Sequence, residues 1–171
     1  MALDASDSDL HRSGDTAALV RRYYGPVYGL VRRLLRDEAD AHDATQETFA
    51  RAIAHLRSYD PRKPFRVWIF AIAANHVRDL LRKRRQIPLD ADAEDRVPHL
   101  ELPEEPLFRR EDRDRILQAI ERLPFDWKAV VTLHFQQELS SPEIAETLGI
   151  SVNAVRIRLY RALAVLRKEL S

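Results

Sequence analysis

The sequence predicts an all-α protein made of two small helical domains joined by an acidic, proline-rich linker. Apolar residues recur at helical spacing on both sides of residues 86–111, and the 171-residue chain holds only four glycines. Residues 86–111 contain four of the nine prolines. Proline lacks a backbone donor and restricts the residue before it, so no long helix runs through this segment. We therefore expect domains at residues 1–85 and 112–171.

Charge is unevenly distributed along the chain. The formal net charge is +1, yet residues 86–111 carry −5 while residues 1–85 carry +5 and residues 112–171 carry +1. A passive tether is the ordinary role of such a linker. An acidic tether between two basic modules could also imitate nucleic acid, or occupy a basic channel on a partner.

Several classes of protein are disfavoured by what the sequence lacks. Without cysteine there is no disulfide framework and no thiolate zinc site, and the six histidines form no ligand pair. No glycine-rich phosphate loop or nucleophile elbow is present. The sequence therefore predicts no enzyme, no metal site and no cofactor. The polar N-terminus and the lack of an apolar run of about 20 residues predict a cytoplasmic protein without membrane insertion.

The first domain reads as three or four helices. One spans about residues 17–36, and Gly25-Pro26 is expected to kink or break it. A second spans about residues 40–59, and its inward face is Thr45, Phe49, Ala52, Ile53 and Leu56. Its outward face combines alanines with three polar residues, Asp43, Gln46 and Glu47. This face suits either close approach of another helix or plain exposure to solvent.

A proline-bounded, basic and aromatic loop at residues 59–65 leads into a helix over residues 66–85 with a basic end. The expected core stripe of this helix is Phe65, Trp68, Ile69, Ile72 and Leu80. Cations at a helix C-terminus complement its dipole, while aromatic rings beside arginines suit single-stranded nucleic acid. Tyr59 and Phe65 are the preferred contact residues, and Trp68 is assigned to the core.

Residues 140–166 read as a helix-turn-helix. Gly149 supplies the turn and Ser151 can cap the second helix. One face of that helix is apolar, with Val152, Val155, Leu159, Ala162, Leu163 and Leu166. The opposite face carries Asn153, Ile157, Tyr160 and Arg161, with Arg156 and Arg158 at its flanks. An arginine-rich face favours docking in a DNA major groove over a merely solvated hairpin.

Taken in order, these segments resemble the bacterial sigma factors of the extracytoplasmic-function group, which keep only regions two and four. Residues 19–35 resemble the start of region two. DAHDATQETF, at residues 40–49, resembles the segment that docks on the clamp helices of RNA polymerase. Residues 65–85 resemble the segment that melts and reads the minus-ten element. Residues 123–133 resemble the opening of region four, whose helix-turn-helix reads the minus-thirty-five element.

The resemblance implies roles for individual residues and for partners. It implies polymerase binding by Asp43, Gln46 and Glu47. It implies minus-ten contacts, including a flipped-out base in the loop, by Tyr59, Arg62, Lys63, Phe65, Asn75, Arg82, Arg84 and Arg85. It implies minus-thirty-five contacts by Asn153, Arg156, Ile157, Arg158, Tyr160 and Arg161. The implied partners are core RNA polymerase, promoter DNA and an inhibitory anti-sigma factor, and the linker would run toward the RNA exit channel.

The sequence departs from the family pattern at Ala44-Thr45, where a bulkier Leu-Val pair is usual, and at Asn153-Ala154 and Ile157 in the recognition helix. The recognition-helix departures bear on which promoter is read. Two other classes stay open on the residues alone. One is a stand-alone helix-turn-helix regulator with an N-terminal helical partner-binding domain, which would bind a palindromic site by itself. The other is a helical adaptor whose basic faces meet acidic proteins.

Overall fold

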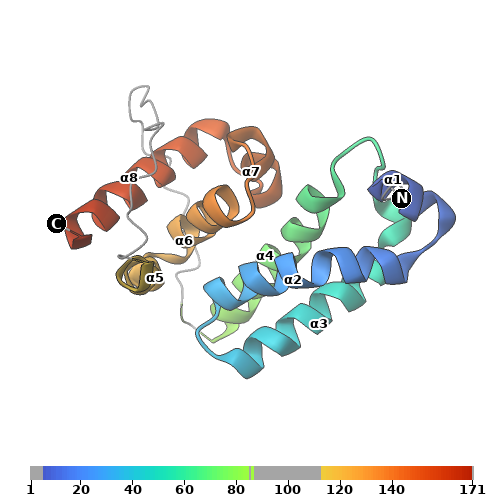
Figure 1. The fold of residues 1–171 in the computed structure, drawn as a ribbon, viewed down its shortest axis with the longest axis horizontal. Helices are drawn as coiled ribbons and strands as arrows, with labels where there is room; N and C mark the ends of the chain where they lie inside the picture. Colours follow the sequence, from blue (N-terminus) through green and yellow to red (C-terminus); the bar gives the residue numbers. More distant parts are fainter. Residues whose placement is uncertain (1–5, 85, 87–112, 171) are drawn as a thin grey trace. The chain divides into compact units, whose positions relative to one another are not determined.

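The computed structural model describes residues 6–84, 86 and 113–170, and within these ranges the secondary structure is helical with no strand (Figure 1). The chain divides into two compact units, Met1–Leu80 and Leu81–Ser171. None of the helices in the described ranges is long and apolar enough to cross a membrane. Most of the expected linker, residues 87–111, lies outside the described residues, so its role stays a prediction.

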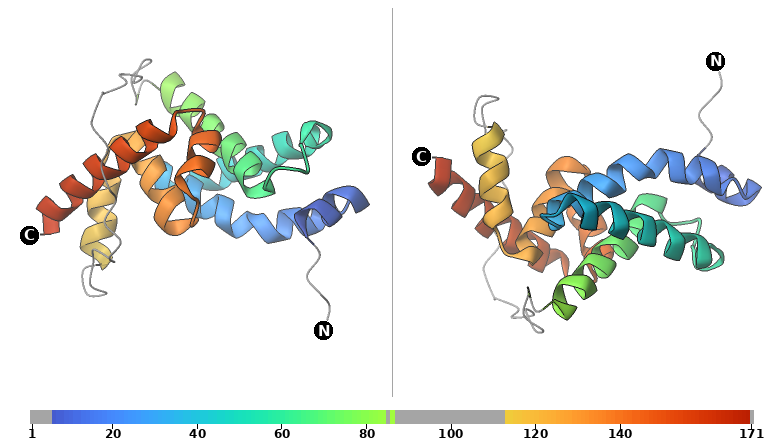
Figure 2. Two further views of the ribbon diagram at one scale, coloured as in Figure 1. Left: turned by 90° about the horizontal axis from the view of Figure 1, so that it is seen from above. Right: turned by 90° about the horizontal axis from the view of Figure 1, so that it is seen from below.

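The first unit is built from α1 (Asp7–Ser13), α2 (Thr16–Leu34), α3 (Glu38–Ala54), a 3-10 turn η1 (Leu56–Ser58) and all but the last turn of α4 (Phe65–Lys83). Helix α2 packs against both α1 and α3, and the views of Figures 1 and 2 place α4 beside this pair. The core that these helices share includes Val27, Leu30, Val31, Ala41, Phe49, Ile69, Phe70 and Val77.

Helix α1 precedes the first helix that the periodicity predicts. Ser6 caps its start by accepting a hydrogen bond from the Asp9 amide at 3.2 Å, and Gly14 ends it in the left-handed conformation at φ 73°. Leu10 is its buried residue. With 7 residues the helix is too short for an apolar repeat to reveal it.

Helix α2 continues through Pro26 and is not broken in two. A proline ring clashes with the amide and the Cβ of the preceding residue when that residue is helical. The preceding residue here is Gly25, which has no Cβ, so part of this conflict disappears. A break at Gly25-Pro26 is therefore the wrong one of the two expected outcomes, and a kink there stays a prediction.

Two expected core faces differ in the structure. Helix α3 ends at Ala54, five residues before the predicted end, and Ile53 is 51% exposed instead of buried. In α4 the buried residues include Phe70 and Val77, whereas Trp68, Ile72 and Leu80 are half-buried. Apolar residues surround most of α4, so their spacing alone does not select the face that packs.

The second unit contains α5 (Arg113–Arg122), α6 (Phe125–Val131), a π-helical turn η3 (Thr132–Gln136), α7 (Ser141–Leu148) and α8 (Val152–Leu170). Helix α8 packs on α5, α6 and α7. Its buried contacts centre on Val130, Leu133, Leu139, Ile144, Leu159 and Leu166. Lys128 is also buried, and its Nζ donates to the Glu121 carbonyl at 2.9 Å in the last turn of α5.

The expected helix-turn-helix is formed by α7 and α8, and its local signals act as predicted. Gly149 ends α7 at φ 66°, and the Ser151 hydroxyl accepts from the Ala154 amide at 3.0 Å at the start of α8. Ser140 and Glu143 form a reciprocal capping box at the start of α7. The turn is thus fixed at both ends by local hydrogen bonds.

We expect Gly149→Ala to destabilise the second unit by about 1–2 kcal/mol, because a side chain at positive φ meets backbone strain. No atom outside its chain neighbours lies within 4 Å of an added Cβ, so the cost is conformational and not steric crowding. Urea unfolding followed by Trp127 fluorescence in a Trp68→Phe background measures it. Gly149→Asn is the matched control and should cost less, because Asn tolerates this conformation. Equal losses for Ala and Asn would contradict the explanation.

Candidate nucleic-acid interface

The polar face of α3 lies at the surface as the sequence predicts. Asp43, Gln46 and Glu47 are all exposed and fall on one side of the helix at spacings of three and four residues. On the buried side, the hydroxyls of Thr45 and Thr48 donate to carbonyls one turn earlier, at 2.7 Å each. The opposite sides of α3 therefore serve the core and an external surface.

Glu47 has a partner on its own helix. Its Oε1 accepts a hydrogen bond from Nε of Arg51 at 2.7 Å, and this bond lowers the pKa of the Glu47 carboxyl. Both side chains are substantially exposed, so the pair adds little stability. Part of the negative charge of the face is therefore matched within α3.

The loop between η1 and α4 buries the aromatic residues at its two ends. Tyr59 is 4% exposed and its hydroxyl donates to the Lys63 carbonyl at 2.6 Å, while Phe65 is 3% exposed. The Tyr59 ring lies 5.1 Å from Phe65 and 5.3 Å from Trp68, measured between centroids. The expectation that Tyr59 and Phe65 lie at the surface is therefore wrong, because their rings pack against His11 of α1, Tyr23 of α2 and Trp68 of α4. Trp68, expected in the core, is half-buried.

Arg62 is exposed at the tip of this loop but is held by an acidic neighbour. The Asp60 carboxylate accepts from the backbone amide of Arg62 at 3.0 Å, and from Nε and Nη2 of its guanidinium at 2.9 Å each. These bonds lower the pKa of Asp60 to about 2. The guanidinium is therefore paired within the loop, although 88% of the Arg62 side chain is exposed to solvent. Lys63 beside it is exposed.

The C-terminal half of α4 presents further expected contact residues. Asn75 is exposed, and its side-chain oxygen accepts from Arg78 at 3.3 Å. Arg84 is exposed, whereas Arg82 is half-buried with a buried Nε that has no hydrogen-bond partner. Arg85 lies outside the described residues.

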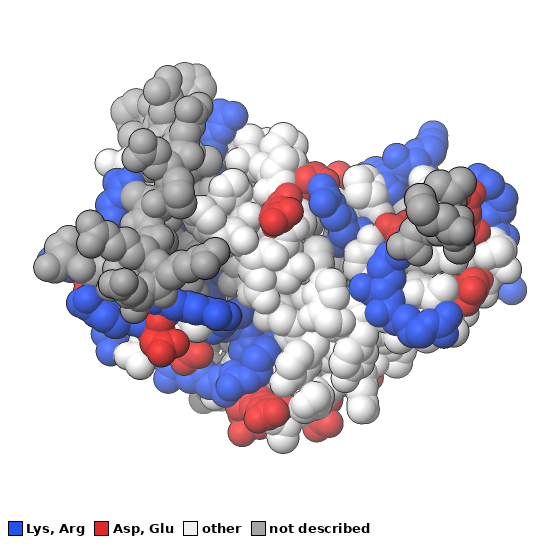
Figure 3. Space-filling view, viewed as in Figure 1, with Lys and Arg blue, Asp and Glu red and all other residues white. Residues whose placement is uncertain are grey.

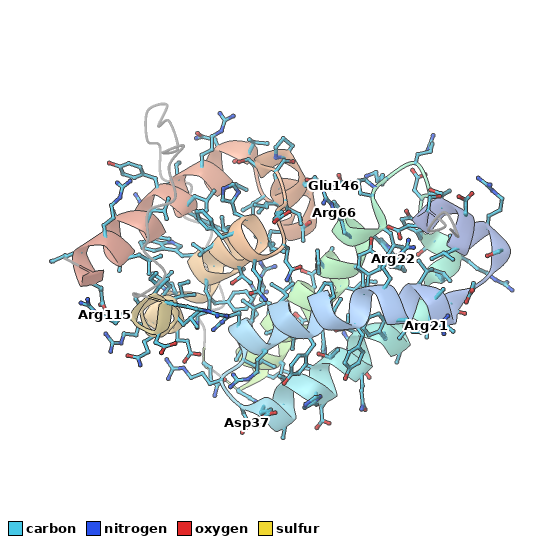
Figure 4. All side chains as sticks on the ribbon, in the orientation of Figure 1. Arg21, Arg22, Asp37, Arg66, Arg115 and Glu146 are labelled. Atoms are coloured by element: carbon cyan, nitrogen blue, oxygen red, sulfur yellow. The ribbon has the colours of Figure 1, made fainter. Side chains whose placement is uncertain are left out.

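Basic residues on α2 also reach the surface of the first unit. Figure 3 shows blue side chains near the N-terminal half of α2, and Figure 4 labels Arg21 and Arg22 there. Arg21 is exposed and Arg22 is half-buried. Neither arginine is predicted from the sequence as a contact residue, because both lie within an ordinary amphipathic helix.

Only some of the residues of α8 that are predicted to contact DNA are exposed in the structure. Asn153, Arg156 and Tyr160 are exposed and follow one another at spacings of three and four residues, so they form one stripe along the helix. We call these three residues the recognition stripe. Arg161 beside it is half-buried.

Two predicted contact residues of α8 are turned toward the protein. Ile157 is 7% exposed, so its assignment to the outer face is wrong: α8 packs against α5, α6 and α7, and this buries more of its circumference than a single apolar stripe. The side chain of Arg158 is 13% exposed, and its Nη1 lies 3.8 Å from Oδ1 of Asp126 on α6. Arg158 therefore ties α8 to α6.

Comparison with known families and proteins gives consistent matches over both units. Residues 19–87 match the family model of sigma-70 region 2, and residues 113–166 match that of sigma-70 region 4. The chain is 34% identical to the ECF RNA polymerase sigma factor SigW of Bacillus subtilis (strain 168), with 90% of this chain and 88% of SigW covered. It is 32% identical to the RNA polymerase sigma-H factor of Pseudomonas aeruginosa, with 89% and 84% covered.

Solved structures show the same fold. The structure of CnrH in complex with the cytosolic domain of CnrY matches with a TM-score of 0.68 at 31% identity, covering 95% of this chain and 94% of that one. CnrH is an RNA polymerase sigma factor of Cupriavidus metallidurans. RpoE of Bartonella quintana, solved in complex with the anti-sigma factor NepR, matches with a TM-score of 0.70 at 19% identity, covering 91% and 96%. The RpoE match shows a shared fold.

Proposed function

The chain belongs to the extracytoplasmic-function (ECF) group of bacterial RNA polymerase sigma factors, and we propose how its two units divide the work of promoter recognition. A protein of this family binds core RNA polymerase and directs it to specific promoters. The observation that carries the division is the order of the two matched regions, with region 2 ahead of a capped helix-turn-helix in region 4. Residues 1–85 then act at the minus-ten element and residues 112–171 at the minus-thirty-five element.

The polar face of α3 is the proposed docking surface for core polymerase. Asp43, Gln46 and Glu47 are exposed together on a helix whose opposite side is fixed in the core. Carboxylates and an amide among small residues permit a partner helix to approach closely. The Arg51 guanidinium bonded to Glu47 leaves further lone pairs of the carboxylate to accept donors from the partner.

The proposed minus-ten surface consists of the exposed polar residues on and after the loop at residues 59–65, namely Arg62, Lys63, Asn75 and Arg84. Tyr59 and Phe65 support this surface indirectly, because both are buried at the two ends of the loop. Arg82 and Arg85 are proposed to contact phosphates. Cationic side chains beside half-exposed Trp68 suit a strand that is opened and unstacked.

The proposed minus-thirty-five contacts come from the recognition stripe and from Arg161. A stripe of an amide, a guanidinium and a phenol can read base edges in a major groove, while neighbouring cations contact phosphates. Ile157 and Arg158 instead face the rest of the unit and help to position α8 on it.

Charge reversal at Glu47 should weaken binding to core polymerase by about tenfold, since a carboxylate at the interface becomes a cation. Glu47→Lys is compared with the wild-type chain by fluorescence anisotropy against core enzyme. The double change Glu47→Arg with Arg51→Glu is the control, because it keeps the intrahelical ion pair and the net charge while moving the carboxylate. Both proteins should lose affinity at unchanged helicity. Normal binding by the single variant would overturn the assignment.

If the Arg156 guanidinium reads a base of the minus-thirty-five element, Arg156→Ala should weaken promoter recognition by about 1–3 kcal/mol on promoters that carry this base. On promoters in which this base is changed, the same substitution should have little effect. Run-off transcription by core polymerase with this chain, on promoters substituted position by position, gives the measurement. Arg84→Ala is the comparison and should reduce transcription uniformly, as expected of a phosphate contact. A uniform loss with Arg156→Ala would make it a phosphate contact as well. Tight, polymerase-independent binding to a palindrome would instead favour a stand-alone regulator.

An inhibitory anti-sigma factor is the proposed regulator. Cysteine is lacking from the chain, and the described residues contain no cluster of three or more potential metal ligands, so a partner is the simplest source of control. Such a partner has to bind at least as tightly as core polymerase to hold the chain inactive. We expect it to co-purify with the chain from uninduced cells and to suppress run-off transcription. Recovery from uninduced cells with polymerase alone, fully active, would contradict this expectation.

A further inference from the structure

Helix α1 lies against the loop at residues 59–65, as Figure 1 shows beside the connection between η1 and α4. We propose that α1 is a clasp that positions this loop for promoter opening, with Ser8 and His11 as its positioning residues. The inference rests on the proposed minus-ten role of the loop. It adds that the loop is held in place by a helix more than forty residues earlier in the sequence.

Two contacts join α1 directly to the loop. The Ser8 hydroxyl donates to the Pro61 carbonyl at 3.1 Å, across 53 positions of sequence. The His11 ring meets the Tyr59 ring edge to face, with centroids 5.1 Å apart. Ser8 therefore holds the tip of the loop, and His11 holds the aromatic residue at its start.

A third residue anchors α1 to the body of the unit. The Asp7 carboxylate pairs with Nη1 of Arg22 at 2.6 Å and accepts a hydrogen bond from the Tyr23 hydroxyl. The side chains of Asp7 and Arg22 are 23% and 29% exposed, which shields the pair partly from water. Burial and the bond to Asp7 both raise the pKa of Tyr23, so its hydroxyl stays a donor even in alkaline solution.

Aromatic packing connects Tyr23, to which α1 is bonded through Asp7, with the loop. The Tyr23 ring lies 5.0 Å from Phe65, and Phe65 lies 5.1 Å from Tyr59. Helix α1 therefore contacts the loop at its tip and at its first residue, Tyr59. The ring of Tyr23 contacts the last residue of the loop, Phe65. Holding a loop in its binding conformation removes part of the entropy that binding otherwise costs.

The clasp predicts a loss of promoter opening without a loss of polymerase binding. We would combine Ser8→Ala with His11→Ala in the full chain, and use Arg12→Ala as the matched control. Arg12 lies on the same helix, its side chain is 78% exposed, and it pairs with Asp9 instead of the loop. In holoenzyme, 2-aminopurine fluorescence in the minus-ten element should report opening about tenfold weaker for the double variant. Ser8→Thr with native His11 keeps the hydroxyl and should open like the wild type.

A second readout needs no promoter. In a Trp127→Phe background Trp68 is the remaining tryptophan of the chain, and it lies within the aromatic cluster under the loop. Loosening the clasp should increase acrylamide quenching of Trp68 in the double variant and leave it unchanged in Arg12→Ala. Core affinity should stay equal in all variants.

The two readouts separate failure of the clasp from failure of the minus-ten assignment. Unchanged quenching and unchanged opening in the double variant would overturn the clasp, as would equal losses in Arg12→Ala. If Lys63→Ala, on the loop itself, leaves opening intact, the minus-ten role of the loop is wrong and so is the clasp's role in opening. Increased quenching with weakened opening, at unchanged core affinity, supports the clasp.

Discussion

Each unit of this protein is so small that the helices proposed to contact DNA also have to build the core. Helix α8 gives Val155, Leu159 and Leu166 to the interior, and with them Ile157. On α8, the recognition stripe remains exposed to an external partner. The same demand acts on α4, where burial of Phe70 and Val77 decides which way Asn75 faces. Burial therefore determines which side of each helix is available to a partner, and the polar residues occupy the positions that stay exposed.

Local signals explain which parts of the structure the sequence could predict. The helix-turn-helix depends on Gly149, Ser151 and a capping box, all of which act within a few residues, so its form was predictable. The position of Tyr59 and Phe65 depends on contacts with α1 and α2, which are distant in sequence. Apolar spacing could not show that the aromatic rings at the two ends of a basic loop are buried against such distant elements.

Pairing of charges is the other property that composition does not reveal. Arg62 is bonded to Asp60, Glu47 to Arg51, and Arg158 approaches Asp126. Arg62, Glu47 and Arg158 are predicted from sequence to face a partner molecule, yet each has an oppositely charged neighbour within its own unit. Such pairs occupy part of a charged group's bonding capacity before any ligand arrives, which formal net charge does not describe.

The π-helical turn at Thr132–Gln136 has a consequence for how this fold tolerates change in length. A π turn accommodates one residue more than the corresponding α-helical turn. Deleting one residue there would restore α-helical geometry and leave the downstream residues close to their present direction, whereas deleting one residue from the α-helical part of α6 would rotate everything downstream by about 100° around the helix axis. The turn before α7 is therefore the place where this helix tolerates the loss of one residue without redirecting the helix-turn-helix.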